Sequence, residues 1–243
     1  MRKFTILLAL LIMCLSSTVV FAGYEVVGGG IYTTFDFSNL NDWIKNVNKD
    51  TFSASDLKSN KFDEIENTAG FYLGGYTDLP TFSPKLKIGG EYENISPDKS
   101  KLYKKENDGF EVDATINIDL QGFTGVAKYQ VNKFIIINGG LGYYTGEYEF
   151  EVENSESYNY TQKADLSGIG AKLGIGSSYS LSENVNIYGN ANYRILTLDM
   201  DFDDSVSVDE AYIDGNYNDQ KDDGEDELDA SGFELTFGLA YKF

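Results

Sequence analysis

FELTFGLAYKF, residues 233–243, alternates strictly between large apolar side chains and small or polar ones. The large side chains occupy the odd-numbered positions: Phe233, Leu235, Phe237, Leu239, Tyr241 and Phe243. A period of two over this length predicts a β-strand with one apolar face and one face of small or polar residues. A tilted strand of about 9–11 residues is also long enough to cross a bilayer. The segment therefore predicts a transmembrane strand.

Seven earlier stretches show the same kind of periodicity, at residues 26–37, 68–78, 85–94, 110–129, 134–152, 168–179 and 185–202. In the first of them Val27, Ile31, Phe35 and Phe37 share one parity. Long polar insertions and short turns alternate along the chain between these stretches. The pattern predicts an all-β fold: an eight-stranded, antiparallel, up-and-down transmembrane β-barrel with long extracellular loops and short periplasmic turns. A closed ring leaves no strand edge exposed to lipid.

Three local features refine this prediction. Residues 40–47 have helical spacing, which predicts a short helix within the first long insertion. Gly122 and Gly125 interrupt a long strand, and we interpret them as a bulge or bend. Splitting the stretches 110–129 and 185–202 would instead give ten strands.

The composition agrees with a barrel. The 243 residues include 25 glycines and 18 tyrosines but only 3 prolines, so strand and turn formers dominate. Beyond the N-terminal segment, the sequence has no apolar run that approaches the ~20 residues of a membrane-spanning helix. The composition therefore argues against a helical membrane protein.

The first residues have the pattern of a secretory signal peptide. Arg2 and Lys3 precede an apolar stretch, and a small residue ends the segment at a plausible cleavage site. We therefore predict a cleaved signal peptide at residues 1–22 and a single barrel domain at residues 23–243. The one cysteine, Cys14, lies inside the signal segment, so the mature domain would have neither disulfides nor thiol chemistry.

The end of the sequence resembles the C-terminal assembly signal of bacterial outer-membrane barrels, in the positions Thr236, Gly238, Tyr241 and Phe243. Together with the strand pattern, it makes residues 24–243 similar to the small OmpA/OmpX-type outer-membrane barrels. The resemblance implies a location in the bacterial outer membrane. The implied partners are membrane lipid, lipopolysaccharide and the barrel assembly machinery, and the implied state is a monomer.

Two soluble folds would show a similar periodicity: a secreted barrel of the lipocalin kind and a β-sandwich. Both would turn the apolar parity inward and the other parity outward. Here the other parity carries many glycines between Lys, Glu, Arg and Asn residues. Glycine adds nothing to solubility, whereas a narrow polar lumen needs it to make room for larger side chains. The membrane barrel is therefore favoured.

Charge and composition also restrict the function. The formal net charge is −20, which argues against nucleic acid as a partner and suits divalent cations or cationic peptides. The sequence has no histidine, so nucleophilic catalysis with a histidine base is excluded. No other catalytic arrangement stands out, and we expect that the protein is not an enzyme.

Four charged residues fall at similar depth on the predicted polar parity: Arg194, Glu234, Lys172 and Glu91. They could meet inside the barrel, either as an ion-pair network that plugs the lumen or as a selectivity ring. Eight strands leave an interior just wide enough for side chains to fill. We therefore predict the plug.

The last long insertion contains the one pattern that is typical of a metal site. DGNYNDQKDDGE, residues 214–225, places oxygen-bearing side chains at five positions of a calcium-binding loop: Asp214, Asn216, Asn218, Asp222 and Glu225. The sixth position, which should be glycine, is Asp219. A solvated acidic loop without Ca²⁺ is the alternative, and no other cofactor is predicted.

The sequence thus predicts an outer-membrane barrel with a structural or surface-interaction role, such as adhesion through its loops. The alternative is a porin-like narrow channel or a transporter for small or apolar molecules. The sequence identifies neither a loop ligand nor a transported molecule.

Overall fold

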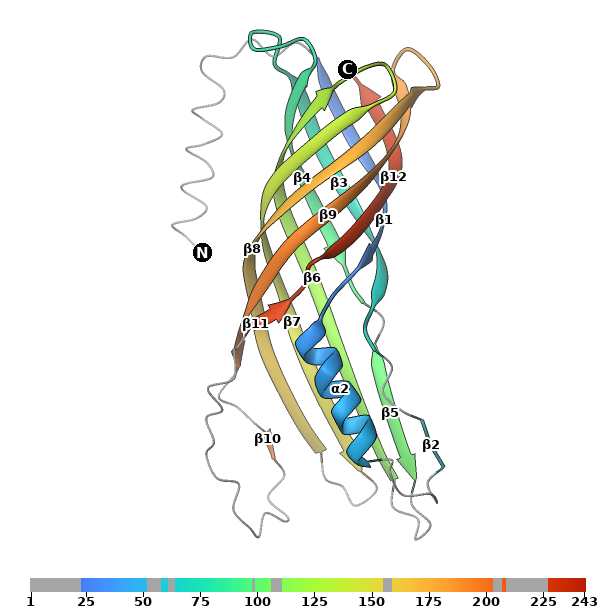
Figure 1. Ribbon diagram of the computed structural model, residues 1–243, viewed down its shortest axis with the longest axis vertical. Coiled ribbons are helices and arrows are strands. Elements are labelled where there is room, and N and C mark those ends of the chain that lie inside the picture. Colours follow the sequence, from blue (N-terminus) through green and yellow to red (C-terminus); the bar gives the residue numbers. More distant parts are fainter. Residues whose placement is uncertain are drawn as a thin grey trace.

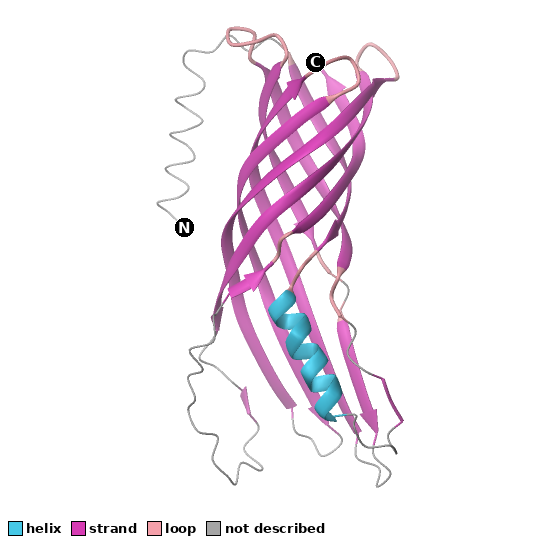
Figure 2. Ribbon diagram, in the orientation of Figure 1, coloured by secondary structure: helices cyan, strands magenta, loops and turns pink. Residues whose placement is uncertain are grey.

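Eight strands of the computed structural model form a closed antiparallel barrel (Figures 1 and 2). The structure describes residues 23–51, 58–60, 64–97, 99–105, 111–154, 159–202, 207–208 and 227–243. The strands of the ring, in order around it, are β1 (Tyr24–Thr34), β3 (Asn67–Asp78), β4 (Leu86–Ile95), β6 (Glu111–Gln130), β7 (Ile136–Asn154), β8 (Asn159–Ser180), β9 (Val185–Phe202) and β12 (Gly232–Lys242). Pairing of β12 with β1 closes the ring, which confirms the predicted fold class.

Short turns join the strands at one end of the barrel, the end at which the chain terminates (top of Figure 1). They lie at residues 79–85, 131–135 and 181–184. The predicted order of long and short connections is therefore correct, and this end is the periplasmic one. The smaller elements all lie toward the opposite, extracellular end: α2 (Ser38–Thr51), β2 (Lys58–Asn60), β5 (Ser100–Lys105), β10 (Ser207–Val208) and β11 (Glu227–Asp229).

The predicted bulge at Gly122 and Gly125 is wrong. β6 keeps one unbroken register with β4 and with β7 through both glycines. Gly122 instead makes room inside the barrel, because a Cβ atom there would lie 2.4 Å from the ring of Tyr144. Since β6 and β9 are each continuous, the ring has eight strands and not ten.

Replacing Gly122 by alanine should lower the free energy of unfolding by about 1–3 kcal/mol, because the buried Tyr144 ring has to shift to admit the methyl group. Gly125→Ala is the matched control on the same strand. Its Cβ would have only one atom within 4 Å, the carbonyl oxygen of Leu141 at 3.8 Å. Chemical denaturation of the refolded barrel would compare the two, and equal losses would contradict this account of Gly122.

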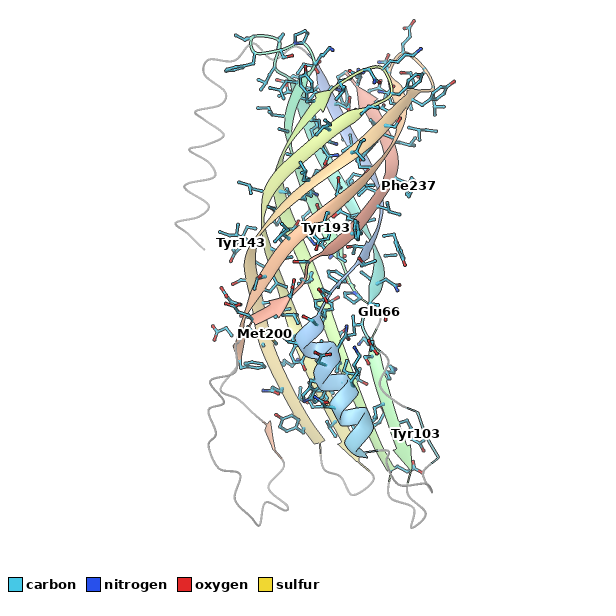
Figure 3. All side chains as sticks on the ribbon, in the orientation of Figure 1. Glu66, Tyr103, Tyr143, Tyr193, Met200 and Phe237 are labelled. Atoms are coloured by element: carbon cyan, nitrogen blue, oxygen red, sulfur yellow. The ribbon has the colours of Figure 1, made fainter. Side chains whose placement is uncertain are left out.

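An apolar band surrounds the periplasmic half of the barrel. Side chains on the outer face of neighbouring strands are large, apolar and exposed, as in Phe123, Leu141, Ile169, Leu173 and Phe237. Tyr143 and Phe237 project from the outside of the barrel on different strands (Figure 3). Such a surface is stable only against lipid. The parity predicted for residues 233–243 is therefore correct, with the odd-numbered side chains outside.

Aromatic side chains mark both edges of this band. Exposed rings near the turns are those of Tyr24, Tyr129, Phe134, Tyr179, Tyr241 and Phe243. Exposed rings toward the extracellular side are those of Tyr32, Tyr143, Tyr193 and Phe233. Aromatic girdles at the two interfaces are typical of transmembrane barrels.

The four longest strands continue well beyond the band. In β8 the sequence predicted a start at residue 168, but the strand begins at Asn159. Its outer side chains change from Ile169 to Ser167, Asp165 and Lys163, and β6, β7 and β9 show the same change to polar residues. The extension lies outside the membrane, so its outer face is exposed to solvent and carries polar residues. For that reason the sequence pattern indicated a polar loop there.

The interior of this extracellular part is apolar, which the predicted polar lumen did not include. Its buried core includes Ile116, Ile118, Leu120, Leu166, Leu196 and Leu198. The predicted helix at residues 40–47 is present as part of α2, which covers this core with Ile44, fully buried, and Leu40. Trp43 contacts Phe150 of β7 edge to face, with 5.8 Å between the ring centres.

The first strand is shorter than predicted and its apolar parity faces inward. β1 ends at Thr34, and Val27 and Ile31 are buried inside while Val26 and Tyr32 face outward. Beyond the strand, Phe35 stacks on Phe37 at 4.6 Å between ring centres, and both enter the extracellular core. Phe35 and Phe37 therefore pack in that core and do not face lipid.

A surface contact ties α2 to the segment before β3. Lys45 lies 3.3 Å from a carboxylate oxygen of Glu64. The hydrogen bond to Glu64, with the negative charge of that residue, raises the pKa of Lys45 above its usual value. Asn41 adds a buried pair of hydrogen bonds to the backbone of Ile65. The helix is therefore anchored on its membrane-proximal side.

Candidate functional site

A cluster of charged side chains fills the lumen at the height of the apolar band. Its centre is Lys172 of β8, whose ammonium group lies 2.8 Å from Glu91 and 3.8 Å from Glu234 and forms a direct ion pair with Glu93. These side chains are at most 9% exposed. Carboxylates from β4 and β12 thus converge on one lysine from β8.

Arg194 of β9 forms the extracellular side of the cluster. Its guanidinium lies 3.6 Å from Glu234 and 3.9 Å from Glu93, and its side chain is 0% exposed. It also donates a hydrogen bond to the hydroxyl of Thr33, at 3.1 Å. The ring of Phe35 stacks over the guanidinium at 5.0 Å, so Arg194 joins the polar lumen to the apolar extracellular core.

Lys128 of β6 forms the periplasmic side. Its ammonium group lies 3.4 Å from Glu91 and 3.8 Å from the ring centre of Tyr76. The Tyr76 hydroxyl donates to the same carboxylate. The cluster therefore contains three carboxylates and three cations, and its formal charges balance. Balanced and mutually paired charges of this kind can be kept away from water.

Polar side chains around the ions fill the remaining cross-section. Asn192 donates to Glu234 at 2.7 Å, and the Tyr144 hydroxyl lies 3.4 Å from both Glu93 and Thr124. At the level of the cluster the side chains are buried and in mutual contact, as expected for the narrow interior of eight strands. The cluster therefore acts as a plug in the lumen.

The prediction for this site is confirmed for all four residues: Arg194, Glu234, Lys172 and Glu91 meet in the lumen. Two members were missed. Glu93 was visible on the polar parity, two residues after Glu91. Lys128 could not be placed, because the expected bulge at Gly122 and Gly125 left the face of every later residue in that strand undetermined.

A second polar feature lies outside the barrel, just beyond the apolar band. Four exposed carboxylates from neighbouring strands are directly paired across the sheet: Asp119 with Glu147, Glu147 with Asp165, and Asp165 with Asp201. Among the described residues, no such acidic group is arranged to hold a metal ion. We call these four residues the acidic row. Like charges directly opposite one another destabilise a sheet, so stability does not explain them.

Two sequence predictions concern residues outside the described ranges. The calcium candidates Asp214, Asn216, Asn218, Asp222 and Glu225 all lie there, as does the signal peptide at residues 1–22. Both stay predictions.

Neither a scan of protein-family models nor a search of curated proteins finds a match to this chain. Solved structures with a similar fold include Ail, the attachment invasion locus protein of Yersinia pestis, at 13% identity, with 91% of this chain and 99% of that chain covered and a TM-score of 0.43. A major outer-membrane protein of Thermus thermophilus has 11% identity and a TM-score of 0.46, and the match covers 90% of this chain and 99% of that chain. The outer-membrane protease OmpT of Escherichia coli has 9% identity and a TM-score of 0.38, and the match covers 93% of this chain and 99% of that chain.

Identities this low carry no residue or activity from those proteins to this one. The assignment comes from the chain itself: a closed ring, short turns at one end and an apolar outer band between two aromatic edges. This chain is an eight-stranded β-barrel protein of the bacterial outer membrane.

Proposed function

We propose that the protein is a surface-interaction protein, whose barrel holds a rigid acidic platform above the membrane. The observation that carries the proposal is the continuation of β6, β7, β8 and β9 beyond the apolar band, around an apolar core that α2 covers. A barrel that only anchored mobile loops would not need such a core. We call this part, with its acidic outer face, the extracellular platform.

The charge of the platform indicates the kind of partner. The acidic row holds four carboxylates side by side, and exposed acids at Asp113, Glu151 and Asp199 extend the negative surface on the same face. Lys163 is the single basic residue among the outward side chains of residues 159–167. A positively charged partner would relieve the repulsion within the row, and long-range attraction would speed its approach. The proposed partner is therefore a basic peptide or protein surface.

The charged plug argues against the alternative function, a narrow channel. A selectivity ring needs open space at its centre, whereas here Lys172 occupies that position in contact with carboxylates from two strands. The absence of histidine from the sequence supports a non-enzymatic role. Both points favour a scaffold whose function lies on its outer surface.

The test is binding of a cationic probe, short polylysine, to the barrel refolded in nanodiscs. Neutralising the acidic row with Asp119→Asn, Glu147→Gln, Asp165→Asn and Asp201→Asn should weaken binding at least about tenfold at low salt, since each lost contact is worth several tenths of a kcal/mol or more. The loss should shrink as salt rises.

A matched control removes the same amount of charge from the other side of the platform. It combines Asp36→Asn, Asp42→Asn, Glu64→Gln and Glu66→Gln, which lie beside α2 and not in the row. Binding by this variant should stay within about threefold of the native barrel. If both variants lose affinity equally, net charge and not the row attracts the probe, and the proposed surface is wrong.

A further inference from the structure

The periplasmic mouth of the lumen contains a cavity that the proposed function does not use. It has a volume of about 280 Å³ and lies between the turns and the ion cluster. Pockets for small ligands usually measure about 300–1,000 Å³, so this cavity is just below that range. The cavity is large enough for a metabolite-sized ion.

Lysine is the most frequent residue in the lining of this cavity, although the chain as a whole has a formal charge of −20. The five lysines are Lys85, Lys87, Lys128, Lys133 and Lys242. Only two carboxylates, Glu25 and Asp78, join them in the lining. The sequence contains 19 basic residues in total, so about a quarter of them gather at this one opening.

Three of the five lysines have no charged partner among the described residues. Lys87 is paired with Glu25, and Lys128 with Glu91. Lys85, Lys133 and Lys242 form no ion pair with any residue that the structure describes. The Lys85 ammonium donates only to the backbone carbonyl of Val131, at 3.2 Å, which joins two periplasmic turns. Three lysines against the one remaining carboxylate, Asp78, leave the lining with excess positive charge among the described residues.

Two nearly buried side chains form the inner wall of the cavity. Tyr188 of β9 lines the cavity and is 6% exposed, and its hydroxyl oxygen is shielded from the cavity. Lys128, 7% exposed, lies on the same wall, with its ammonium group 5.1 Å from the Tyr188 ring centre.

We propose that this cavity binds a small anion with two or more negative charges, of the phosphate or carboxylate class, from the periplasmic side. The exposed lysines at the rim attract the anion and hold it by charge. The anion goes no further, because Lys128 already pairs with Glu91 and the ion cluster closes the lumen behind it. The site is a terminal one and not an entrance to a pore.

The test is calorimetric titration of the refolded barrel in zwitterionic micelles, with pyrophosphate and citrate as separate probes. At least one of them should bind saturably with a dissociation constant at or below about 1 mM. Binding of only one probe would identify the oxyanion class, and binding of both would show that charge alone is selected. No saturable binding of either probe up to about 10 mM would overturn the proposal.

Variants distinguish this site from general attraction. Lys85→Gln with Lys133→Gln should weaken binding at least about tenfold, because two of the three unpaired rim charges are lost. Lys45→Gln with Lys163→Gln is the matched control, with the same change of net charge in the extracellular part, and should leave the affinity within about twofold. Equal losses from the two lysine pairs would overturn the site. Since none of these variants alters the acidic row, their outcome is independent of the proposed surface function.

Discussion

Replacing Lys172 by methionine should lower the free energy of unfolding of the barrel by about 3–5 kcal/mol. Methionine keeps an unbranched side chain, one atom shorter than that of lysine, but removes the charge on which three carboxylates converge. Glu91 would keep Lys128, and Glu234 would keep Arg194. Glu93 would retain no closer cation than Arg194 at 3.9 Å, together with the Tyr144 hydroxyl at 3.4 Å. An uncompensated carboxylate in a buried site accounts for the size of the loss.

Reversible unfolding in lipid vesicles would measure this effect. The only tryptophan, Trp43, lies on α2, so its fluorescence reports the extracellular platform. Circular dichroism or the heat-dependent shift on gels reports the barrel. The control is Lys163→Met on the same strand, because Lys163 is exposed and its pair with Glu149 should contribute no more than about 1 kcal/mol.

A second variant tests whether charge balance is the cause. Removing Glu93 together with Lys172, as Lys172→Met with Glu93→Gln, leaves two intact pairs, Lys128 with Glu91 and Arg194 with Glu234. The double variant should therefore recover more than half of the stability lost in Lys172→Met. Losses that simply add would show that the cluster acts as packing and not as a balanced set of charges.

The sequence predicted those parts of the fold in which one rule acts along a whole strand. In β12 the lipid face and the lumen face alternate without exception, so residues 233–243 gave the correct strand, the correct faces and the lumen position of Glu234. The same rule placed Arg194 and Lys172, because β8 and β9 cross the membrane with apolar outer residues such as Leu173 and Ile195.

The prediction failed where the surroundings of a strand change along its length. Residues 159–167 continue β8, but outside the membrane their outer face is solvated and their inner face packs Ala164 and Leu166. The side chains still alternate, but the apolar residues face outward within the membrane and inward outside it. Periodicity alone cannot show which face of a strand is exposed to solvent. The sequence therefore predicted neither the extracellular core nor the inward orientation of Val27 and Ile31.

Residues that belong to no pattern were missed for a different reason. Lys85 and Lys133 lie in separate turns, and Lys242 lies near the end of β12. Only closure of the ring brings them to one opening, so their common cavity is a property of the tertiary structure. The acidic row has the same origin, because the register of four strands determines which acids become neighbours.

Replacing Leu173 by arginine should destabilise the barrel by about 2–4 kcal/mol, the cost of a charge near the middle of the lipid-facing band. Leu173 is 68% exposed, and on β8 it lies between Ile169 and Tyr179, the outer limits of the apolar band on this strand. Its neighbours across the sheet are Gly139 and Tyr193, neither of which offers a charge to pair with the arginine.

The control for Leu173→Arg is Ser167→Arg, on the same strand and the same outer face but beyond the apolar band. Its cross-strand neighbour Asp199 can pair with an arginine, so the change in stability should be within about 1 kcal/mol of zero. Unfolding of both variants in the same lipid vesicles measures the difference in stability. The two positions share a strand and a face, and differ in whether they contact the bilayer. If Leu173→Arg were as stable as Ser167→Arg, the outer face of β8 at Leu173 would not be in contact with lipid. The assignment of the membrane band would then be wrong.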